Sequence, residues 1–194
     1  MKKVFLCIPT LATAGAEKFV VDLASNINNK AFDVSVIVTY KLNSTDLYKK
    51  LLSEKIKVIN LGYEKNRLKT IIELTKLFLK ERPDVVHANV GSLQYVALPA
   101  FLSGVKKKLF TVHSMAYRIA GGRMKRIYNL AFHYFGFKPV GISQIVTESI
   151  IQEYGMQSDL VATVNNGIDI QKFAPEASKM DGDITFINVG TLYY

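Results

Sequence analysis

Short apolar runs alternate with longer amphipathic segments along the chain, and this alternation limits the folds available to it. Unbroken apolar runs are typical of strands buried on both faces of a parallel sheet. One such run occurs at residues 4–8, and shorter or interrupted apolar runs predict further strands at residues 34–38, 56–61, 84–87, 109–112, 139–142 and 160–164. Segments with helical spacing separate them, at residues 16–27, 47–52, 68–79, 93–101, 125–135 and 143–154. The sequence therefore predicts an α/β, Rossmann-like parallel sheet with helices on both faces, joined by right-handed crossovers.

The helix over residues 68–79 is expected to bury one side and to expose lysines on the other. The buried side would consist of Leu68, Ile71, Ile72, Thr75, Phe78 and Leu79.

The last part of the chain predicts a second unit. Residues 1–173 form the expected amino-terminal domain, and residues 174–182 read as a linker because small and polar side chains dominate them. Residues 183–194 contain a fresh apolar run that ends in Gly190, as in the first strand of another α/β domain. The alternative is that this strand extends the edge of the first sheet.

Composition narrows the possibilities further. A chain of 194 residues that is 49% hydrophobic can bury one large core. The longest apolar run, residues 95–102, is too short to cross a bilayer, so no membrane span is expected. The apolar start is cut by Pro9 without a cleavage site, which indicates a cytoplasmic protein. The single Cys7 is expected to be buried, and no side chains show metal-ligand spacing, so neither a metal nor a cofactor is expected.

A ligand crevice is expected where the first strand meets the first helix. This helix opens on Ala14, Gly15, Ala16 and Glu17. A glycine there lets a ligand approach bare backbone N–H groups, and the helix dipole favours an anion. The alternative is that Gly15 only eases a tight turn.

Short polar side chains collect at the carboxyl ends of the predicted strands, where open α/β sheets bind ligands. They include Asn89, His113, Ser143 and Asn166, with Gly167 beside them, and Tyr40 follows the second strand. His113 is expected to hydrogen-bond a substrate hydroxyl, or alternatively to hold a loop carbonyl. His87 is expected to point into the sheet, and His133 to be structural.

The net charge of +9 favours acidic partners. Arg118, Arg123, Lys125 and Arg126 surround the start of a helix whose later part is apolar on almost every side. Such a basic collar beside aromatic residues favours a membrane surface or lipid phosphate. The alternative is a helix that faces the core and has a solvated first turn. A nucleic-acid partner is not expected, because the basic and aromatic residues do not interleave.

Six motifs, taken in order, resemble the family four retaining glycosyltransferases. They are residues 14–17, 82–89, 111–113, 140–143, 164–169 with Phe173, and 186–190. The chain is similar to the amino-terminal, acceptor-side half of a GT-B enzyme, followed by the first strand of the donor-side domain.

The resemblance implies that a sugar passes from a nucleotide diphosphate sugar to a glycan or lipid-linked acceptor with its anomeric configuration kept. His113 would be the catalytic residue that contacts the transferred sugar, and Gly15 with its neighbours Ala14 and Ala16 would face the donor across the cleft. Glu17, Asn89, Ser143 and Asn166 would shape the acceptor side or the hinge, and Gly167 is a further candidate for substrate binding. Leaving-group charge would be stabilised by a helix terminus and basic residues.

Several positions depart from the family pattern. Ala14 replaces the first glycine of a pair, Asn89 stands where many members have histidine, and Thr191 replaces a phosphate-binding arginine. The residues that hold the donor would follow Tyr194, so this chain alone is expected to be inactive. A non-catalytic sugar- or nucleotide-binding module is the main alternative. A nicotinamide-dependent enzyme fits poorly, because the glycine spacing of that class is missing.

Overall fold

The computed structural model describes residues 1–28, 31–62, 66–119, 121–168 and 170. Within this part of the chain, seven parallel strands form one sheet in the order β3-β2-β1-β4-β5-β6-β7. The strands are β1 (Lys2–Ile8), β2 (Phe32–Val38), β3 (Lys57–Asn60), β4 (Val85–Asn89), β5 (Lys107–Val112), β6 (Phe137–Gly141) and β7 (Ala162–Thr163). The predicted Rossmann-like parallel sheet is confirmed.

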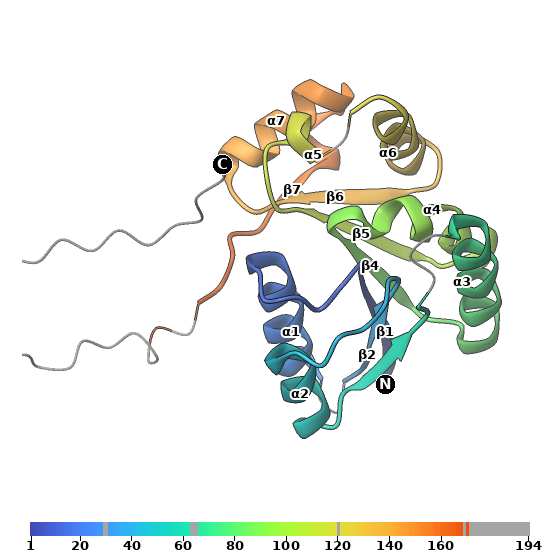
Figure 1. Ribbon diagram of the computed structural model, residues 1–194. Helices are drawn as coiled ribbons and strands as arrows, with labels where there is room; N and C mark the ends of the chain where they lie inside the picture. Colours follow the sequence, from blue (N-terminus) through green and yellow to red (C-terminus); the bar gives the residue numbers. More distant parts are fainter. Residues whose placement is uncertain (29–30, 63–65, 120, 169, 171–194) are drawn as a thin grey trace, which may run out of the picture.

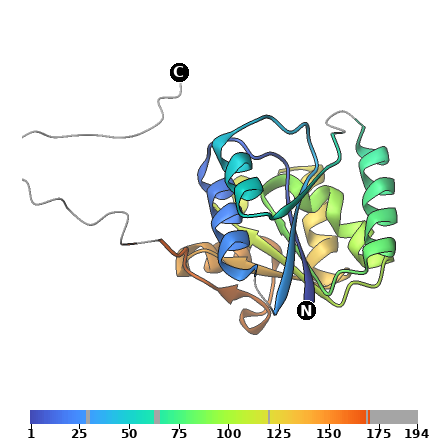
Figure 2. The same ribbon diagram turned by 90° about the horizontal axis from the view of Figure 1, so that it is seen from below.

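Helices cover both faces of the sheet (Figure 1, Figure 2). Helices α1 (Gly15–Ile27) and α2 (Asp46–Ser53) pack on one face, beside β1 and β2. The other face carries α3 (Arg67–Glu81), α4 (Leu93–Leu102), α5 (Ala116–Ile119), α6 (Arg123–His133) and α7 (Gln144–Tyr154). Two short 3₁₀ turns, η1 (Val90–Ser92) and η2 (Ser158–Leu160), complete the described elements.

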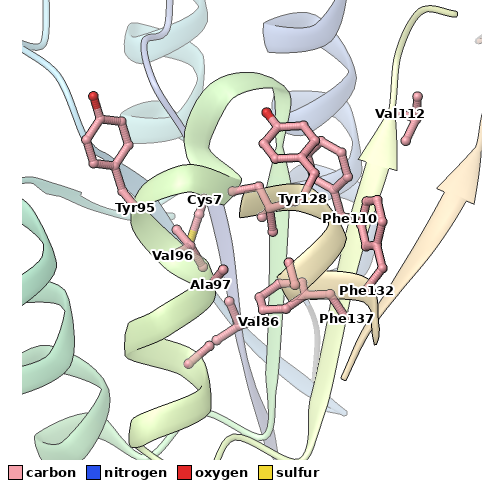
Figure 3. Close-up of a cluster of buried hydrophobic side chains, with 14 of the residues drawn as sticks. Cys7, Val86, Tyr95, Val96, Ala97, Phe110, Val112, Tyr128, Phe132 and Phe137 are labelled. Carbon is pink, nitrogen blue, oxygen red and sulfur yellow. The ribbon is translucent and has the colours of Figure 1, made fainter. Parts of the chain in front are cut away.

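Two apolar clusters fill the space between the sheet and its helices. The larger cluster lies under α3, α4, α6 and α7, and Figure 3 shows part of it, with Cys7 and Val86 facing α4 and aromatic side chains of β5 and α6 beside them. Cys7 is fully buried, as predicted, and burial raises the pKa of its thiol. The smaller cluster joins α1 and α2 to β1 and β2.

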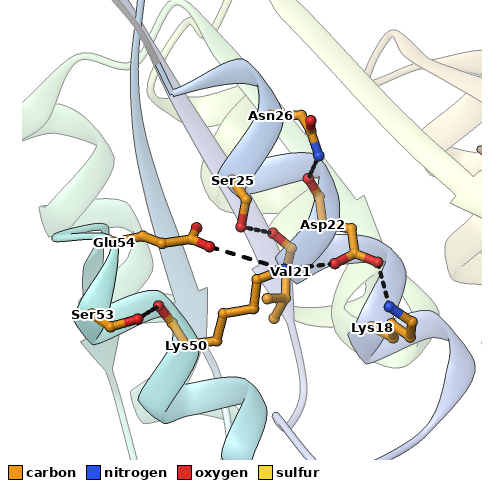
Figure 4. A network of polar contacts seen from close by, with 8 residues as sticks. All are labelled: Lys18, Val21, Asp22, Ser25, Asn26, Lys50, Ser53 and Glu54. Carbon is orange, nitrogen blue, oxygen red and sulfur yellow. Dashed lines mark hydrogen bonds and ion pairs between the residues drawn. The ribbon is translucent and has the colours of Figure 1, made fainter. Parts of the chain in front are cut away.

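A polar contact fixes α1 against α2 on the outer surface (Figure 4). The Asp22 carboxylate on α1 accepts hydrogen bonds from Lys18 at 2.7 Å and from Lys50 of α2 at 2.8 Å. Partial burial acts to raise the pKa of Asp22, but the hydrogen bonds from the two lysines outweigh it and lower the pKa. The contact helps to hold the start of α1 in place relative to the sheet.

Strand β6 and helix α7 approach each other too closely for any residue but glycine at position 141. A Cβ atom built on Gly141 would lie 2.3 Å from Thr147 Oγ1 and 2.7 Å from Thr147 N. The Thr147 hydroxyl in turn lies 2.8 Å from that of Thr163 in β7. Gly141 therefore sets how α7 packs on the end of the sheet.

Three expectations about local structure were wrong or incomplete. In α3 the buried residues are Thr70, Leu74 and Phe78, whereas Leu68, Ile72 and Leu79 are exposed. Helix α3 carries apolar residues around much of its circumference, and its contact with α4 decides which of them are buried. The predicted strand at residues 160–164 is reduced to β7, because η2 includes Leu160, and helix α5 was not predicted. The predicted linker at 174–182 and strand at 183–194 lie outside the described residues.

The strand order creates a switch point between β1 and β4. The chain leaves β1 through α1 toward β2, and it leaves β4 through η1 and α4 toward β5, in the opposite direction. Open α/β sheets bind ligands in the crevice that such a reversal leaves at the carboxyl ends of the strands. The candidate site is therefore expected beside the loops that follow β1, β4 and β5.

Candidate functional site

The centre of the site is a contact between two neighbouring strands at their carboxyl ends. His113, the residue after β5, places Nε2 3.1 Å from Oδ1 of Asn89, the last residue of β4. Asn89 is fully buried, and its amide also donates to the carbonyl of His87 at 3.3 Å. The partner of His113 is therefore a side chain at the predicted rim, and not a loop carbonyl.

The hydrogen bonds around Asn89 determine which nitrogen of His113 carries the proton. Asn89 Nδ2 donates to His87, and Oδ1 accepts from the Ser92 backbone in the cap of η1, so Oδ1 is an acceptor. His113 must then donate from Nε2. Burial lowers the pKa of His113 to about 4, so the ring is neutral near pH 7 and its Nδ1 is a hydrogen-bond acceptor.

His87 lies deeper in the sheet than His113, as predicted. It is buried in the sheet, and its Nε2 lies 2.7 Å from Oγ1 of Thr111 in β5. Burial first, and the neighbouring His113 second, lower the pKa of His87 to about 4. His133 is exposed, and its ring nitrogen contacts the Tyr154 carbonyl at 2.9 Å, which agrees with a structural role.

Helix α1 brings its amino terminus to the same place. The ring of Phe19, in its second turn, meets the His113 ring edge-on with 5.0 Å between centroids. Among the described helices, α2, α3 and α7 begin with side chains that cap backbone N–H groups, but Ala14 provides no such cap for α1. The first N–H groups of α1 thus remain available to a ligand.

Gly15 is not required by the local fold. It is exposed, a Cβ built on it would meet no atom within 4 Å, and its φ is not in the left-handed region. A tight turn therefore does not explain the glycine. Nearby, Thr10 donates a hydrogen bond to the Glu17 carboxylate at 3.1 Å, which ties the β1–α1 loop to the first turn of the helix.

The remaining predicted rim residues lie apart from this cluster. Ser143 accepts a 3.4 Å hydrogen bond from the Val146 backbone and caps α7. Asn166 and Gly167 are exposed beyond β7, and no described hydrogen bond joins them to His113 or Asn89. The structure thus places His113 against Asn89 and against Phe19 of α1, the helix that opens on residues 14–17, but it does not bring Ser143, Asn166 or Gly167 to them.

The predicted basic surface is divided between two helices, with Arg118 on α5 and Arg123, Lys125 and Arg126 on α6. Arg118 on α5 lies over the Tyr117 ring at 5.8 Å, and Arg123 is exposed at the start of α6. Lys125 forms an ion pair with Glu153 of α7. Arg126 borders a shallow hollow of about 600 Å³ with Asn129, Leu130, His133 and Tyr134.

Helix α6 is only partly buried. Tyr128, Ala131 and Phe132 pack in the core, whereas Leu130 and Tyr134 are 45% and 74% exposed. On neighbouring α4, Phe101 is also half exposed, and its ring stacks on that of Phe135 with 4.8 Å between centroids. One part of this helix therefore faces the core, and another part is exposed.

Sequence reasoning missed two side chains at this edge, Arg67 and Tyr95. Arg67 is the first residue of α3 and Tyr95 lies in the first turn of α4, whereas the prediction considered only residues that follow strands. No helix in the described ranges is long and apolar enough to span a membrane. Within the same ranges, no group of three or more His, Cys, Asp and Glu side chains is arranged to hold a metal ion.

The parallel α/β sheet, with helices on both faces and a switch point between β1 and β4, is Rossmann-like and matches one half of a GT-B glycosyltransferase. The family model for glycosyltransferase family 4 matches residues 13–172. The chain belongs to this family.

Similar proteins agree with this assignment. The chain is 29% identical, over 59% of its length, to the UDP-Gal:α-D-GlcNAc-diphosphoundecaprenol α-1,3-galactosyltransferase of Escherichia coli, of which it covers 31%. A glycosyltransferase from Rickettsia africae superimposes with a TM-score of 0.72 at 20% identity, covering 92% of this chain and 46% of that one. Anabaena HepE in complex with UDP-glucose gives 0.71 at 17% identity, covering 88% and 45%. The chain thus spans about a third of the sequence relative and about half of these structures.

Proposed function

We propose that this chain is the acceptor-side half of a retaining glycosyltransferase that moves a sugar from a nucleotide diphosphate sugar to a glycan or lipid-linked acceptor. Family membership supports the transferase. The name of the E. coli relative supports a UDP-sugar donor and an acceptor linked to a lipid through a diphosphate. The complex of Anabaena HepE with UDP-glucose supports a nucleotide-sugar donor as well. Retention rests on the resemblance of the motifs to retaining enzymes.

The observation that carries the proposal is the contact of His113 with Asn89 and with Phe19 of α1. In this proposal, Nδ1 of His113 accepts a hydrogen bond from a hydroxyl of the transferred sugar, because Nε2 is already bonded to Asn89. Asn89 acts as a positioning residue that fixes the ring. A histidine with a pKa of about 4 stays neutral during turnover and so remains an acceptor.

The start of α1 has a second role in this proposal. Its uncapped N–H groups and the helix dipole face the diphosphate and stabilise negative charge as the leaving group departs. Gly15 keeps the backbone accessible, since no side chain covers it. Glu17 shapes the acceptor side, and Ser143, Asn166 and Gly167 lie toward the hinge with the donor-side half.

Transfer by the full-length protein tests this proposal. The protein is incubated with UDP-galactose and a short-chain GlcNAc-diphosphoprenol, and the anomeric configuration of the product is determined by NMR. His113→Ala is expected to lower kcat by about a hundredfold, the effect of removing one preorganised polar contact in other enzymes. The control is His133→Ala, which removes an exposed imidazole on α6. An inverted product would disprove retention, and equal losses in both variants would disprove the role of His113.

The 194-residue chain by itself is expected to show no transfer. The donor would be held mainly by the part of such enzymes that this chain does not match, since it covers 31% of the E. coli relative and 46% of the Rickettsia structure. Turnover by the purified chain, measured as release of UDP, would contradict the proposal that residues outside this chain hold the donor.

We also propose a peripheral contact with the inner, cytoplasmic face of the membrane. Arg118 on α5 and Arg123 and Arg126 on α6 supply positive charge, and Leu130 and Tyr134 supply exposed apolar surface beside Arg126. Lys125 contributes less, because Glu153 neutralises it. Basic residues near an anionic membrane each contribute about 1 kcal/mol, and the apolar side chains add to this.

Sedimentation with vesicles of anionic phosphatidylglycerol tests the membrane contact. The double variant Arg123→Gln/Arg126→Gln is expected to bind about tenfold more weakly, since two charges near the surface are lost. A matched control is Lys80→Gln/Lys106→Gln, which removes two exposed charges that form no ion pair with the described residues. Absence of binding at low salt, or equal weakening in the control, would rule the contact out.

A further inference from the structure

Three side chains from separate segments meet at the carboxyl edge of the sheet, beside the site already described. Tyr40 follows β2, Arg67 begins α3, and Tyr95 lies in the first turn of α4. The two tyrosine rings meet edge-on at 5.8 Å, and their hydroxyl oxygens are 3.2 Å apart. The guanidinium of Arg67 lies 6.0 Å from the centre of the Tyr95 ring.

The hydroxyl groups of Tyr40 and Tyr95 together have one hydrogen-bond donor that their mutual bond does not use. Two phenols carry two protons, and only one of these is used in the bond between Tyr40 and Tyr95. No other described group accepts from either hydroxyl. Tyr95 is buried, and burial raises its pKa to about 12, so its hydroxyl keeps its proton. A ligand that accepts hydrogen bonds would satisfy the second proton.

Arg67 has positive charge that no described carboxylate balances. Its side chain is exposed and makes one long hydrogen bond, 3.4 Å to the Gln94 carbonyl. No acidic residue lies in the first turn of α3. By contrast, Lys3, Lys18 and Lys50 each pair with a carboxylate. A guanidinium beside aromatic rings is well suited to a phosphate, which it can bind through two parallel hydrogen bonds.

The cluster is joined to the His113 site by the short turn η1. Asn89 begins this turn, and a Cβ built on Gly91 would lie 3.8 Å from Pro9 in the β1–α1 loop. Tyr128 of α6 donates a 3.4 Å hydrogen bond to the Val90 carbonyl, and Figure 3 shows the hydroxyls of Tyr95 and Tyr128 pointing to the same side.

Val90 itself is held in an unfavourable conformation. Its φ is +52°, a value that β-branched residues rarely adopt, and the side chain is 39% exposed. The surrounding bonds from Asn89, Ser92 and Tyr128 hold this backbone conformation in place. Strained residues of this kind gather at ligand-binding sites, where they present backbone and side chain in a fixed position.

We propose that Arg67, together with the Tyr40–Tyr95 hydroxyl pair, binds a phosphate group of the acceptor. The inference rests on the proposed function, and it adds a subsite and a ligand class to it. The acceptor lies across η1, with its phosphate at Arg67 and the sugar hydroxyl that receives the transferred group toward His113. The acceptor is therefore a phosphorylated or diphosphate-linked glycan.

Diphosphate binding by the 194-residue chain tests the subsite directly. Farnesyl diphosphate, inorganic pyrophosphate and UDP are titrated separately, and the dissociation constants are measured by calorimetry. Arg67→Gln is expected to weaken binding of farnesyl diphosphate and pyrophosphate by about tenfold or more, because a hydrogen-bonded charge pair is lost. Tyr95→Phe, which keeps the ring, is expected to weaken both several-fold.

Arg82→Gln is the matched control, because Arg82 is equally exposed and caps the opposite end of the same helix. Equal weakening in Arg67→Gln and Arg82→Gln, or no measurable binding of either diphosphate, would overturn the proposal. A loss confined to UDP would overturn it as well, since the arginine would then bind the donor. Thermal unfolding of each variant verifies that it is folded.

Failure of this subsite is distinguishable from failure of the proposed function. If the full-length protein transfers no sugar but Arg67 still selects diphosphates, the transferase assignment of the site fails and the subsite stands. If transfer depends on His113 but not on Arg67, the transferase stands and the subsite is refuted.

Discussion

Replacing glycine by alanine is expected to have opposite effects on stability at positions 15 and 141. At Gly15 an added methyl group meets no atom within 4 Å, and the residue begins a helix. Gly15→Ala is therefore expected to leave the free energy of unfolding unchanged or to raise it by about 0.5 kcal/mol, since alanine restricts the unfolded chain. If the glycine is present for a ligand, the same variant should impair binding of the donor.

The expected loss of donor affinity can be estimated from the hydrogen bonds that Gly15→Ala would remove. A methyl group at the start of α1 would separate a diphosphate from one or two backbone N–H donors. Hydrogen bonds to charged groups contribute about 1.5–3 kcal/mol each, which corresponds to at least a tenfold rise in KM for the donor. Initial rates of the full-length protein at varied UDP-galactose concentration measure this effect.

Gly141→Ala provides the contrast. The new Cβ would overlap Thr147 Oγ1 at 2.3 Å and the backbone nitrogen of the same residue at 2.7 Å, so α7 must move. We expect a loss of about 3 kcal/mol in the free energy of unfolding, at the upper end for overpacking. Adding Thr147→Ala should restore stability only in part, because the backbone nitrogen remains. A destabilised Gly15→Ala, or one with unchanged KM, would refute the assignment of Gly15 to a ligand.

Two further predictions concern stability. Burial lowers the pKa values of His87 and His113 to about 4, below the ordinary value of about 6.5, so the unfolded chain binds more protons between these two pH values. Stability is therefore fully present above pH 6.5 and falls as the pH drops toward 4, by about 2 kcal/mol for each histidine between pH 7 and 4.5. Urea unfolding should show a smaller loss in His87→Gln, and an equal loss would exclude this histidine as a cause. Phe78→Ala should cost about 3–5 kcal/mol in the same assay, because the side chain is fully buried against Phe5, whereas exposed Leu79→Ala should change stability by less than about 0.5 kcal/mol. Similar values for the two would contradict the burial of α3.

Much of the site could be predicted because its residues follow strands, and the alternation of strands and helices places the ends of those strands at one edge of the sheet. His113 and Asn89 directly follow or end apolar runs, so their place at the carboxyl edge follows from a parallel sheet. The bond between them could not be predicted, because it depends on β4 and β5 being neighbours in the sheet. Arg67 and Tyr95 were missed for a related reason. Each lies in the first turn of a helix, and its position there gives no sign of a binding role. The two side chains meet only because α3 and α4 pack together.

The sequence by itself determined the class of fold and the positions of its strands and longer helices. A strand covered on both faces needs a run of apolar residues, and an amphipathic helix needs apolar residues at helical spacing. Both patterns can be read from neighbouring residues in the sequence. Only the tertiary structure decided which side of α3 is buried, why residue 141 must be glycine, and which side chains surround His113. These features depend on contacts between segments far apart in the chain, and local patterns carry no information about such contacts.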